Sequence, residues 1–191
     1  MEGILIISAF LLGSIPFGYL IALFKGIDIR KYGSGNVGAT NVARVLGKSY
    51  GIAVYVLDFL KGFIPTLIAV KSFGIESWVT TAVGLSAILG HMFSPFLLFK
   101  GGKGVATSSG VLFALSPLLG FLALVLWFVI YKKSGFVSLG SILSAFAVVY
   151  ITGALGYPPN VLLMVGLVAV LVLVKHKSNI KRLLEGRELR V

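Results

Sequence analysis

The sequence lacks cysteine and is poor in acidic residues. Its 191 residues include no cysteine, six aspartate and glutamate residues, and 12% charged residues in total, whereas a soluble domain has roughly 25%. The absence of cysteine excludes disulfides, thiolate nucleophiles and thiolate metal ligands. Together with 58% hydrophobic residues and a mean hydropathy of +1.03, the scarcity of charge indicates an integral membrane protein.

Strict alternation of apolar and polar residues is also missing from the long apolar runs, which favours helices over a β-barrel. The first run follows Glu2 rather than a basic region, so we interpret it as a retained span and not a cleaved signal peptide. Runs near the roughly 20 residues that cross a bilayer predict spans over residues 3–24, 50–70, 77–99, 136–153 and 160–174.

The remaining apolar segment, residues 104–131, decides the topology. Ser116 and Pro117 lie near its middle, where proline disfavours a continuous helix. We therefore predict two short helices, at about 104–116 and 117–131, that enter the membrane and return. The expected fold is a single all-α membrane domain over residues 1–191, with seven membrane-embedded helices, the N-terminus outside and the C-terminus cytoplasmic.

Positive charge is concentrated in four clusters. Fifteen of the 17 lysines and arginines fall within residues 25–48, 100–103, 132–133 and 175–190. The predicted topology places all four clusters on the cytoplasmic side, as the positive-inside rule requires. Three clusters also carry glycine, hydroxyl, amide or imidazole groups, a combination suited to binding a phosphate at the membrane surface.

The first such cluster reads GSGNVGATNVAR, residues 33–44. Its glycines allow close approach of the backbone to a ligand, its polar side chains supply hydrogen-bond donors, and its arginine supplies a guanidinium fork. The candidate ligand-contacting residues are Ser34, Gly35, Asn36, Thr40, Asn41 and Arg44. The alternative is a polar turn that caps the next helix.

The second cluster reads KGGKGVATSSG, residues 100–110. Gly101, Gly102 and Gly104 can turn backbone amides toward an anion at a helix N-terminus, and Lys103 adds a full charge. The sequence is not GxxxxGK[ST], so nucleotide hydrolysis is not implied. The alternative is a glycine-lysine turn at the membrane interface.

The third cluster reads HKSNIKRLLEGRE, residues 176–188. In a continuous helix His176, Asn179 and Arg182 would share one face. A histidine beside an amide and a guanidinium is suited to positioning a hydroxyl and a carbonyl. The alternative is a basic amphipathic helix that rests on anionic lipid.

Together these three motifs resemble those of the bacterial acyl-phosphate-dependent glycerol-3-phosphate acyltransferases, integral membrane enzymes of phospholipid synthesis. The resemblance implies that Ser34 and Arg44 are needed for catalysis and that His176 and Asn179 act at the reacting centre. It also implies that the segment up to Thr107, with its glycines and Lys103, holds glycerol 3-phosphate, and we expect Arg182 to bind substrate. Glu185 is expected to support the tail structurally.

The family's reaction moves an acyl group from acyl phosphate to the 1-hydroxyl of glycerol 3-phosphate. The resemblance implies a bacterial cytoplasmic (inner) membrane location, a cytoplasmic active site, and a soluble upstream enzyme that forms the acyl phosphate. We expect a monomer in membrane lipid, with no cofactor, metal or nucleic acid. The His-x4-Asp pair of other acyltransferases is absent, because Phe96 and Lys181 follow the two histidines at that spacing. The proton acceptor is either His176 or the donor phosphate.

Four polar residues inside the predicted spans are further candidates. Asp58 and Lys61 are spaced to pair across one helical turn, and His91 and Ser141 each follow a glycine. The alternative for Asp58 and Lys61 is that they neutralise each other or serve packing, and the alternative for His91 and Ser141 is a hydrogen-bonded helix contact, which is the preferred interpretation of His91. Two other function classes fit the charge pattern less well: a transporter would need charged outer loops, and a structural anchor would not need three glycine-rich donor clusters.

Overall fold

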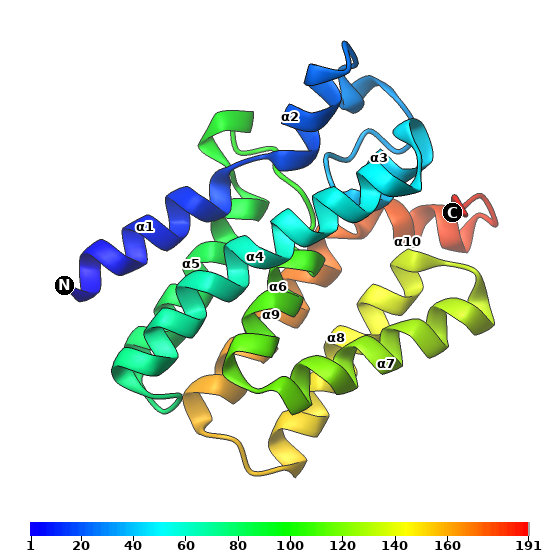
Figure 1. Cartoon of the computed structure of the whole chain (residues 1–191). Coiled ribbons are helices and arrows are strands. Elements are labelled where there is room, and N and C mark those ends of the chain that lie inside the picture. Colours follow the sequence, from blue (N-terminus) through cyan, green and yellow to red (C-terminus); the bar gives the residue numbers. More distant parts are fainter. Residues whose placement is uncertain (191) are drawn as a thin grey trace.

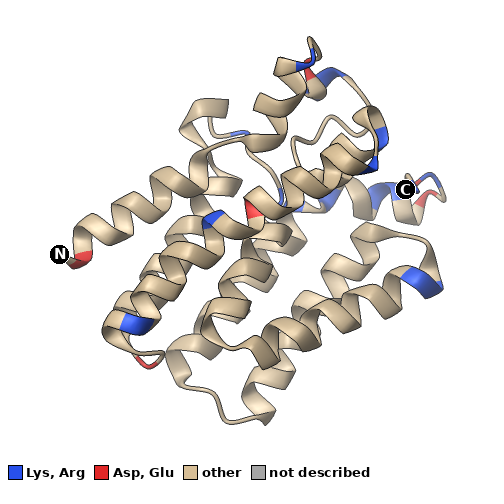
Figure 2. Cartoon of the chain, viewed as in Figure 1, with Lys and Arg blue, Asp and Glu red and all other residues tan. Residues whose placement is uncertain are grey.

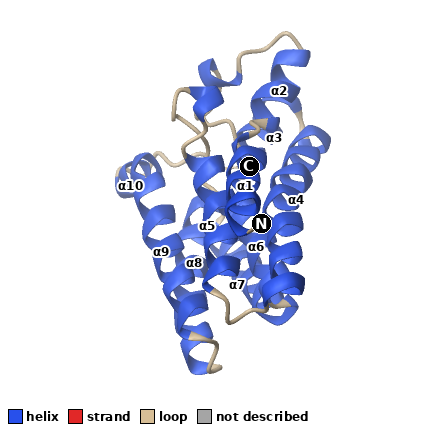
Figure 3. Ribbon diagram, turned by 90° about the vertical axis from the view of Figure 1, so that its left-hand side faces the viewer, coloured by secondary structure: helices blue, strands red, loops and turns tan. Residues whose placement is uncertain are grey.

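The structure is a computed structural model that describes residues 1–190, and it consists of helices joined by loops, with no strand in that range (Figures 1 and 3). In chain order the elements are α1 (Glu2–Ser14), α2 (Phe17–Phe24), η1 (Ile29–Lys31), α3 (Ala39–Leu46), α4 (Lys48–Phe73), α5 (Trp78–Met92), η2 (Pro95–Leu97), α6 (Val105–Leu115), α7 (Pro117–Ser134), α8 (Val137–Ala154), α9 (Pro159–Lys175) and α10 (Lys177–Leu184). The predicted all-α class is confirmed.

Five segments of the described chain are long and apolar enough to cross a membrane: Glu2–Phe24, Lys48–Phe73, Trp78–Leu97, Pro117–Ser134 and Val137–Ala154. Helices α9 and α10 pass the same test only as a pair, which is bent by 58°. Helix α6 is apolar but has 11 residues, a rise of about 16 Å against a bilayer core of about 30 Å.

The first predicted span is broken in the middle. Pro16 separates α1 from α2, and the backbone carbonyls before it are released from the helical pattern. The Oγ of Ser94 donates to the carbonyl of Ser14 at 2.6 Å, and Nζ of Lys61 donates to the carbonyl of Ile15 at 2.8 Å. These side chains supply the hydrogen bonds that the bilayer cannot, so the break is stable inside the protein.

The turn between α6 and α7 follows the sequence expectation. Ser116 is the N-cap of α7, and its Oγ accepts a hydrogen bond from the amide of Leu119 at 3.4 Å. Pro117 occupies the first helical position, where its missing N–H costs nothing. The chain therefore reverses at the serine-proline pair, as predicted.

The length predicted for the second of these helices is wrong. Helix α7 runs past Tyr131 to Ser134 and has 18 residues, enough to cross the membrane. We expected it to end where Lys132 begins the basic pair, but lysines do not terminate a helix. Gly135, with φ of +76°, is the residue that ends α7 in a left-handed cap.

Helices α4 and α6 pack closely through reciprocal glycines. A side chain on Gly62 would collide with the carbonyl oxygen of Thr107, and one on Gly110 would collide with the carbonyl of Phe59. Small residues of this kind let membrane helices approach backbone to backbone. This contact fixes the start of α6, and with it the second motif, against α4.

The outer surface of the bundle is apolar over most of its length. Large side chains such as Ile7, Ile64, Phe128 and Val170 are 61%, 45%, 50% and 55% exposed, as expected for helices that face lipid. Figure 2 shows that lysine and arginine gather at the end of the molecule that carries α3 and α10. The first and third sequence motifs, which include α3 and α10, lie at this basic end.

Candidate active site

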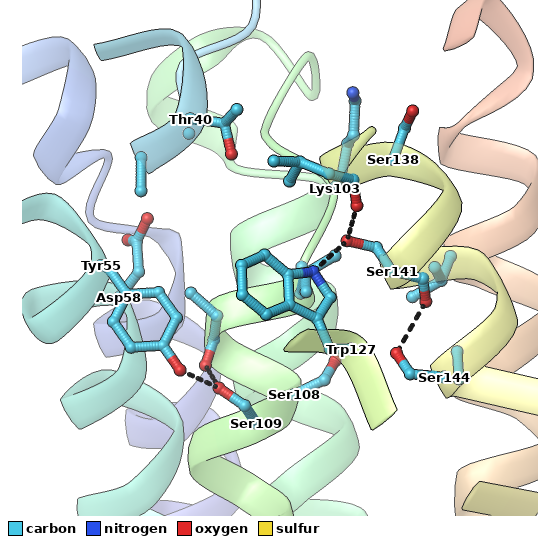
Figure 4. A pocket seen from close by; sticks show the side chains of 18 of the residues that line it. Thr40, Tyr55, Asp58, Lys103, Ser108, Ser109, Trp127, Ser138, Ser141 and Ser144 are labelled. Carbon is cyan, nitrogen blue, oxygen red and sulfur yellow. Dashed lines mark hydrogen bonds between the residues drawn. The ribbon is translucent and has the colours of Figure 1, made fainter. Parts of the chain in front are cut away.

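A cavity of about 620 Å³ joins the three motifs. It is lined by the loop before α3, the loop before α6 and the junction of α9 with α10, and it continues between the helices (Figure 4). The predicted site residues that line it are Ser34, Asn36, Thr40, Asn41, Arg44, Asp58, His91, Lys103, Gly104, Ser141, His176 and Asn179. Segments more than 130 residues apart in the sequence therefore meet at one site.

Asn41 organises the first motif. Its Oδ1 accepts from the amide of Ser34 at 2.8 Å, and its Nδ2 donates to the carbonyls of Asn36 at 2.9 Å and Tyr32 at 3.0 Å. A side chain on Gly33, which has φ of +59°, would collide with this Oδ1. The buried amide of Asn41 thus shapes the loop that holds Ser34 at the cavity.

The second motif is held by His91. The amide of Gly102 donates to the carbonyl of His91 at 3.1 Å, and a side chain on Gly102 would collide with the imidazole. Lys103 follows and donates from Nζ to Oδ1 of Asn179. Burial lowers the pKa of Lys103 to about 8; Glu188 opposes this shift, and the cation of Arg182 adds to it.

The third motif bends at His176. Its Nδ1 lies 2.7 Å from the carbonyl oxygen of Val172. Because a carbonyl oxygen only accepts, Nδ1 must carry the proton, and Nε2 of a neutral ring then keeps its lone pair. Asn179 follows one turn into α10, so both residues line the cavity although His176 stands at the bend between the helices.

The chain folds back after α10 and places Glu188 in the site. Oε1 of Glu188 accepts from Oγ of Ser138 at 2.8 Å and from Nδ2 of Asn179, and Oε2 pairs with Nε of Arg182 at 2.8 Å. Burial opposes the charge, but hydrogen bonds from Asn179, Ser138 and Arg182 outweigh it and hold the pKa of Glu188 below its ordinary value.

Arg44 fastens the same tail. Its Nη2 donates to the carbonyl of Leu189 at 2.8 Å and its Nε donates to the carbonyl of Arg190 at 3.0 Å. The first motif is therefore joined to the end of the described chain. We call residues 186–190 the C-terminal strap; within it, Glu188 lines the cavity.

Away from the mouth the cavity wall is mostly apolar, with a few polar side chains such as Ser108 and Ser144. Its buried wall includes Ile88 of α5, Val111 of α6 and Val168 of α9. On the opposite side it is lined by Ile52 of α4 and Leu124 of α7, whose side chains are 64% and 41% exposed. The cavity thus opens sideways between α4 and α7, toward the surface that faces lipid.

The comparison with known proteins agrees with these motifs. The family model for glycerol-3-phosphate acyltransferase matches residues 3–186. A glycerol-3-phosphate acyltransferase of Aquifex aeolicus strain VF5 is 56% identical over 187 residues, which are 96% of each chain. One from Geobacter sulfurreducens is 49% identical and covers 98% of this chain and 96% of its own. This chain belongs to the glycerol-3-phosphate acyltransferase family.

Solved structures extend the match to the fold. The crystal structure of PlsY (YgiH), an integral membrane glycerol 3-phosphate acyltransferase, in its glycerol 3-phosphate form superposes with a TM-score of 0.98 at 54% identity, covering 100% of this chain and 95% of that one. A lysophosphatidic acid form of PlsY superposes with a TM-score of 0.94 at 53% identity, covering 99% and 94%. The predicted family, its acyltransferase class and its integral membrane nature are confirmed.

Several predicted residues lie beside the cavity without lining it. Thr107 is fully buried toward α4, and Arg182 is turned to Glu188. Lys61 pairs with Asp58 at 2.7 Å. In total, six of the predicted site residues do not line the cavity: Gly35, Lys61, Gly101, Gly102, Thr107 and Arg182.

Among the second group of candidates, Asp58 lies between the lysine Lys61 and the imidazole of His91. Its Oδ1 lies 2.7 Å from Nζ of Lys61 and 3.6 Å from Nδ1 of His91, and all three side chains are buried. Ser141 lines the cavity and accepts from Nε1 of Trp127 at 3.3 Å (Figure 4). These three buried side chains link the break between α1 and α2 to the second motif, because Lys61 bonds the carbonyl of Ile15 and the carbonyl of His91 accepts from Gly102.

The contacts of Glu188 were not predicted from the sequence. We expected Glu185 to support the tail, but Glu185 pairs with Arg187 at 2.6 Å in a largely exposed contact. Glu188 makes the buried contacts because the chain turns at Gly186, with φ of +67°. That glycine is the available signal, since glycine after a helix predicts a reversal. In residues 1–190 no three His, Asp or Glu side chains are grouped so as to hold a metal ion.

Proposed function

We propose that this protein transfers an acyl group from acyl phosphate to the 1-hydroxyl of sn-glycerol 3-phosphate, giving 1-acyl-sn-glycerol 3-phosphate and inorganic phosphate. This would be the first acylation of phospholipid synthesis. The observation that carries the proposal is that one cavity joins a mouth with Arg44 and Lys103 to an apolar interior. Phosphate groups suit the mouth, and a fatty chain suits the interior.

The three motifs would divide the binding of the two phosphates. Lys103, with the glycines around it and the N-terminus of α6, would hold glycerol 3-phosphate. Ser34 and the loop shaped by Asn41 would face the acyl phosphate, with Asn36 and Thr40 as further donors. Asn179, already bonded to Lys103, would align the two halves of the site.

The reaction needs charge neutralisation more than a strong acid. The 1-hydroxyl oxygen attacks the acyl carbonyl carbon, and the bond from that carbon to the phosphate oxygen breaks. Donors at the mouth would stabilise the negative charge that develops. The hydroxyl proton passes to Nε2 of His176 or to the phosphate of the donor. We favour the phosphate, because the donor would then accept the proton itself and no protein base would be needed.

The proposed membrane arrangement has one domain and seven membrane-embedded segments: the broken α1–α2 span and helices α4, α5, α6, α7, α8 and α9. The concentration of lysine and arginine at one end (Figure 2) supports a cytoplasmic active site, a cytoplasmic C-terminus and an external N-terminus in the bacterial inner membrane. We propose a monomer that receives acyl phosphate from a soluble enzyme upstream.

The decisive experiment measures phosphate release by the purified protein in detergent or lipid cubic phase. Acyl phosphate is supplied with and without glycerol 3-phosphate, beside an acyl-coenzyme A control. Phosphate release that depends on glycerol 3-phosphate, with formation of lysophosphatidate and none from the thioester, is the expected result. A folded protein that gives no turnover would contradict the proposal, and uptake of phosphate into sealed vesicles would then indicate transport.

A further inference from the structure

One face of α9 forms a continuous wall of the cavity from its mouth to its deepest point. The residues of this wall recur at helical spacing and, apart from His176 at the mouth, are apolar. They are Met164, Val165, Val168, Ala169, Val172 and His176. All six are buried, so this face is closed to lipid.

The wall stops at Met164. Val161, three residues deeper on α9, is fully buried and does not line the cavity. On α8 the lining likewise reaches Val148 and does not include Thr152, one turn deeper. A Cβ atom added to Gly84 of α5 would lie 3.2 Å from the sulfur of Met164. The two residues are therefore in close contact. Met164 is therefore a side chain packed in place at the floor of the cavity.

The distance from the mouth to this floor follows from the helix itself. His176 and Met164 are twelve residues apart in sequence, a rise of about 18 Å at about 1.5 Å per residue. An extended hydrocarbon with bonds of about 1.5 Å advances about 1.25 Å per carbon along its zigzag. The wall therefore matches an extended acyl chain of about 14 carbons whose carbonyl lies beside His176.

We infer that Met164 sets the length of the acyl chain by forming the floor on which the methyl end of the chain rests. This inference rests on the proposed acyl transfer. Each further methylene inside an apolar cavity should strengthen binding about fourfold until the floor is reached. Beyond that length the chain must bend or leave through the opening between α4 and α7, so turnover falls.

The test is a profile of kcat/KM against chain length, with acyl phosphates from 8 to 20 carbons in steps of two, chosen around the estimate of about 14. Met164→Ala removes three heavy atoms from the floor and should move the optimum about two carbons longer. Ala169→Leu places a larger side chain in the wall, five residues nearer the mouth than Met164, and should shift the optimum to shorter acyl chains. Val170→Ala, at a site on α9 that is 55% exposed, is the matched control and should leave the profile unchanged.

Opposite shifts in the two wall variants would support Met164 as the floor. Profiles that match the wild type in both variants, with size-exclusion traces and thermal unfolding showing folded protein, would overturn the inference while leaving acyl transfer intact. A folded wild type with no turnover at any length would overturn both. Should Met164→Ala fail to fold, an unchanged optimum in folded Ala169→Leu would still overturn the inference.

Discussion

Arg44 donates a hydrogen bond from Nε to the carbonyl oxygen of Arg190 at a distance of 3.0 Å, across 146 residues of sequence. The contact joins the first motif to the strap that follows the third. Arg44 also lines the cavity, so its effect on activity can come from the strap, from the substrate or from both.

Replacing Arg44 removes its hydrogen bonds to the strap and should reduce activity. Hydrogen bonds from a charged donor contribute about 1.5–3 kcal/mol each, so Arg44→Ala should lower kcat/KM at least about tenfold. A truncation that ends the chain at Glu188 removes the two carbonyls that Arg44 contacts. If the strap carries the effect, the double variant should be no worse than the single ones in a double-mutant cycle. Additive losses would instead indicate direct contact of Arg44 with substrate.

Lys103 should make substrate affinity depend on pH. Its pKa of about 8 means that it carries its charge below that pH and loses it above. The KM for glycerol 3-phosphate should therefore rise above about pH 8, approaching tenfold per pH unit. Lys103→Arg, which stays charged throughout, should flatten the profile between pH 8 and 10, and Lys103→Ala should raise KM at every pH. An equal rise in Lys103→Arg would assign the pH dependence to another group.

His176 should affect turnover more than affinity. Its Nδ1 donates a hydrogen bond to the carbonyl oxygen of Val172. Nε2 is therefore the ring nitrogen that can contact the reacting atoms. His176→Ala should lower kcat by roughly 10²-fold or more if the imidazole is the proton acceptor, with little change in KM for glycerol 3-phosphate. A loss of kcat well below tenfold would favour the donor phosphate as acceptor. Steady-state kinetics over both substrates separate the two cases.

Much of this site could be predicted from the sequence, because each of its segments is determined by residues that are close together in the chain. The Gly-rich loop before α3, the Gly-Lys turn before α6 and the reversal at Ser116 and Pro117 each follow from backbone preferences within a few residues. Their meeting at one end of the bundle follows from the clustering of positive charge. The apolar runs likewise indicated the helices of the bundle.

What sequence reasoning missed depends on contacts between distant segments. The break at Pro16 persists because Lys61 and Ser94 reach its freed carbonyls from other helices. Glu188 acts in the site because the chain turns at Gly186 and meets Ser138 of α8. Neither contact has a periodic pattern, so neither could be inferred from spacing alone.

The buried pair of Asp58 and Lys61 should matter for stability. Removing one partner of a buried ion pair typically costs about 3–5 kcal/mol, because the other charge is left uncompensated. Asp58→Asn should therefore lower the thermal unfolding midpoint in detergent substantially. The double variant Asp58→Asn with Lys61→Met removes both charges and should unfold at a higher temperature than the single variant. Equal midpoints would show that Lys61 acts mainly through its bond to Ile15.

The strap has a consequence for the synthesis of the protein on the ribosome. Glu188 and the carbonyls of Leu189 and Arg190 complete a site whose other wall begins at Ser34. The helices that precede residue 188 must be inserted, and residues 188–190 must emerge from the exit tunnel, before the two walls can meet. A nascent chain halted before residue 188 would hold the first and second motifs at the bilayer surface without the contacts of Glu188, so we expect activity only after these residues have been synthesised.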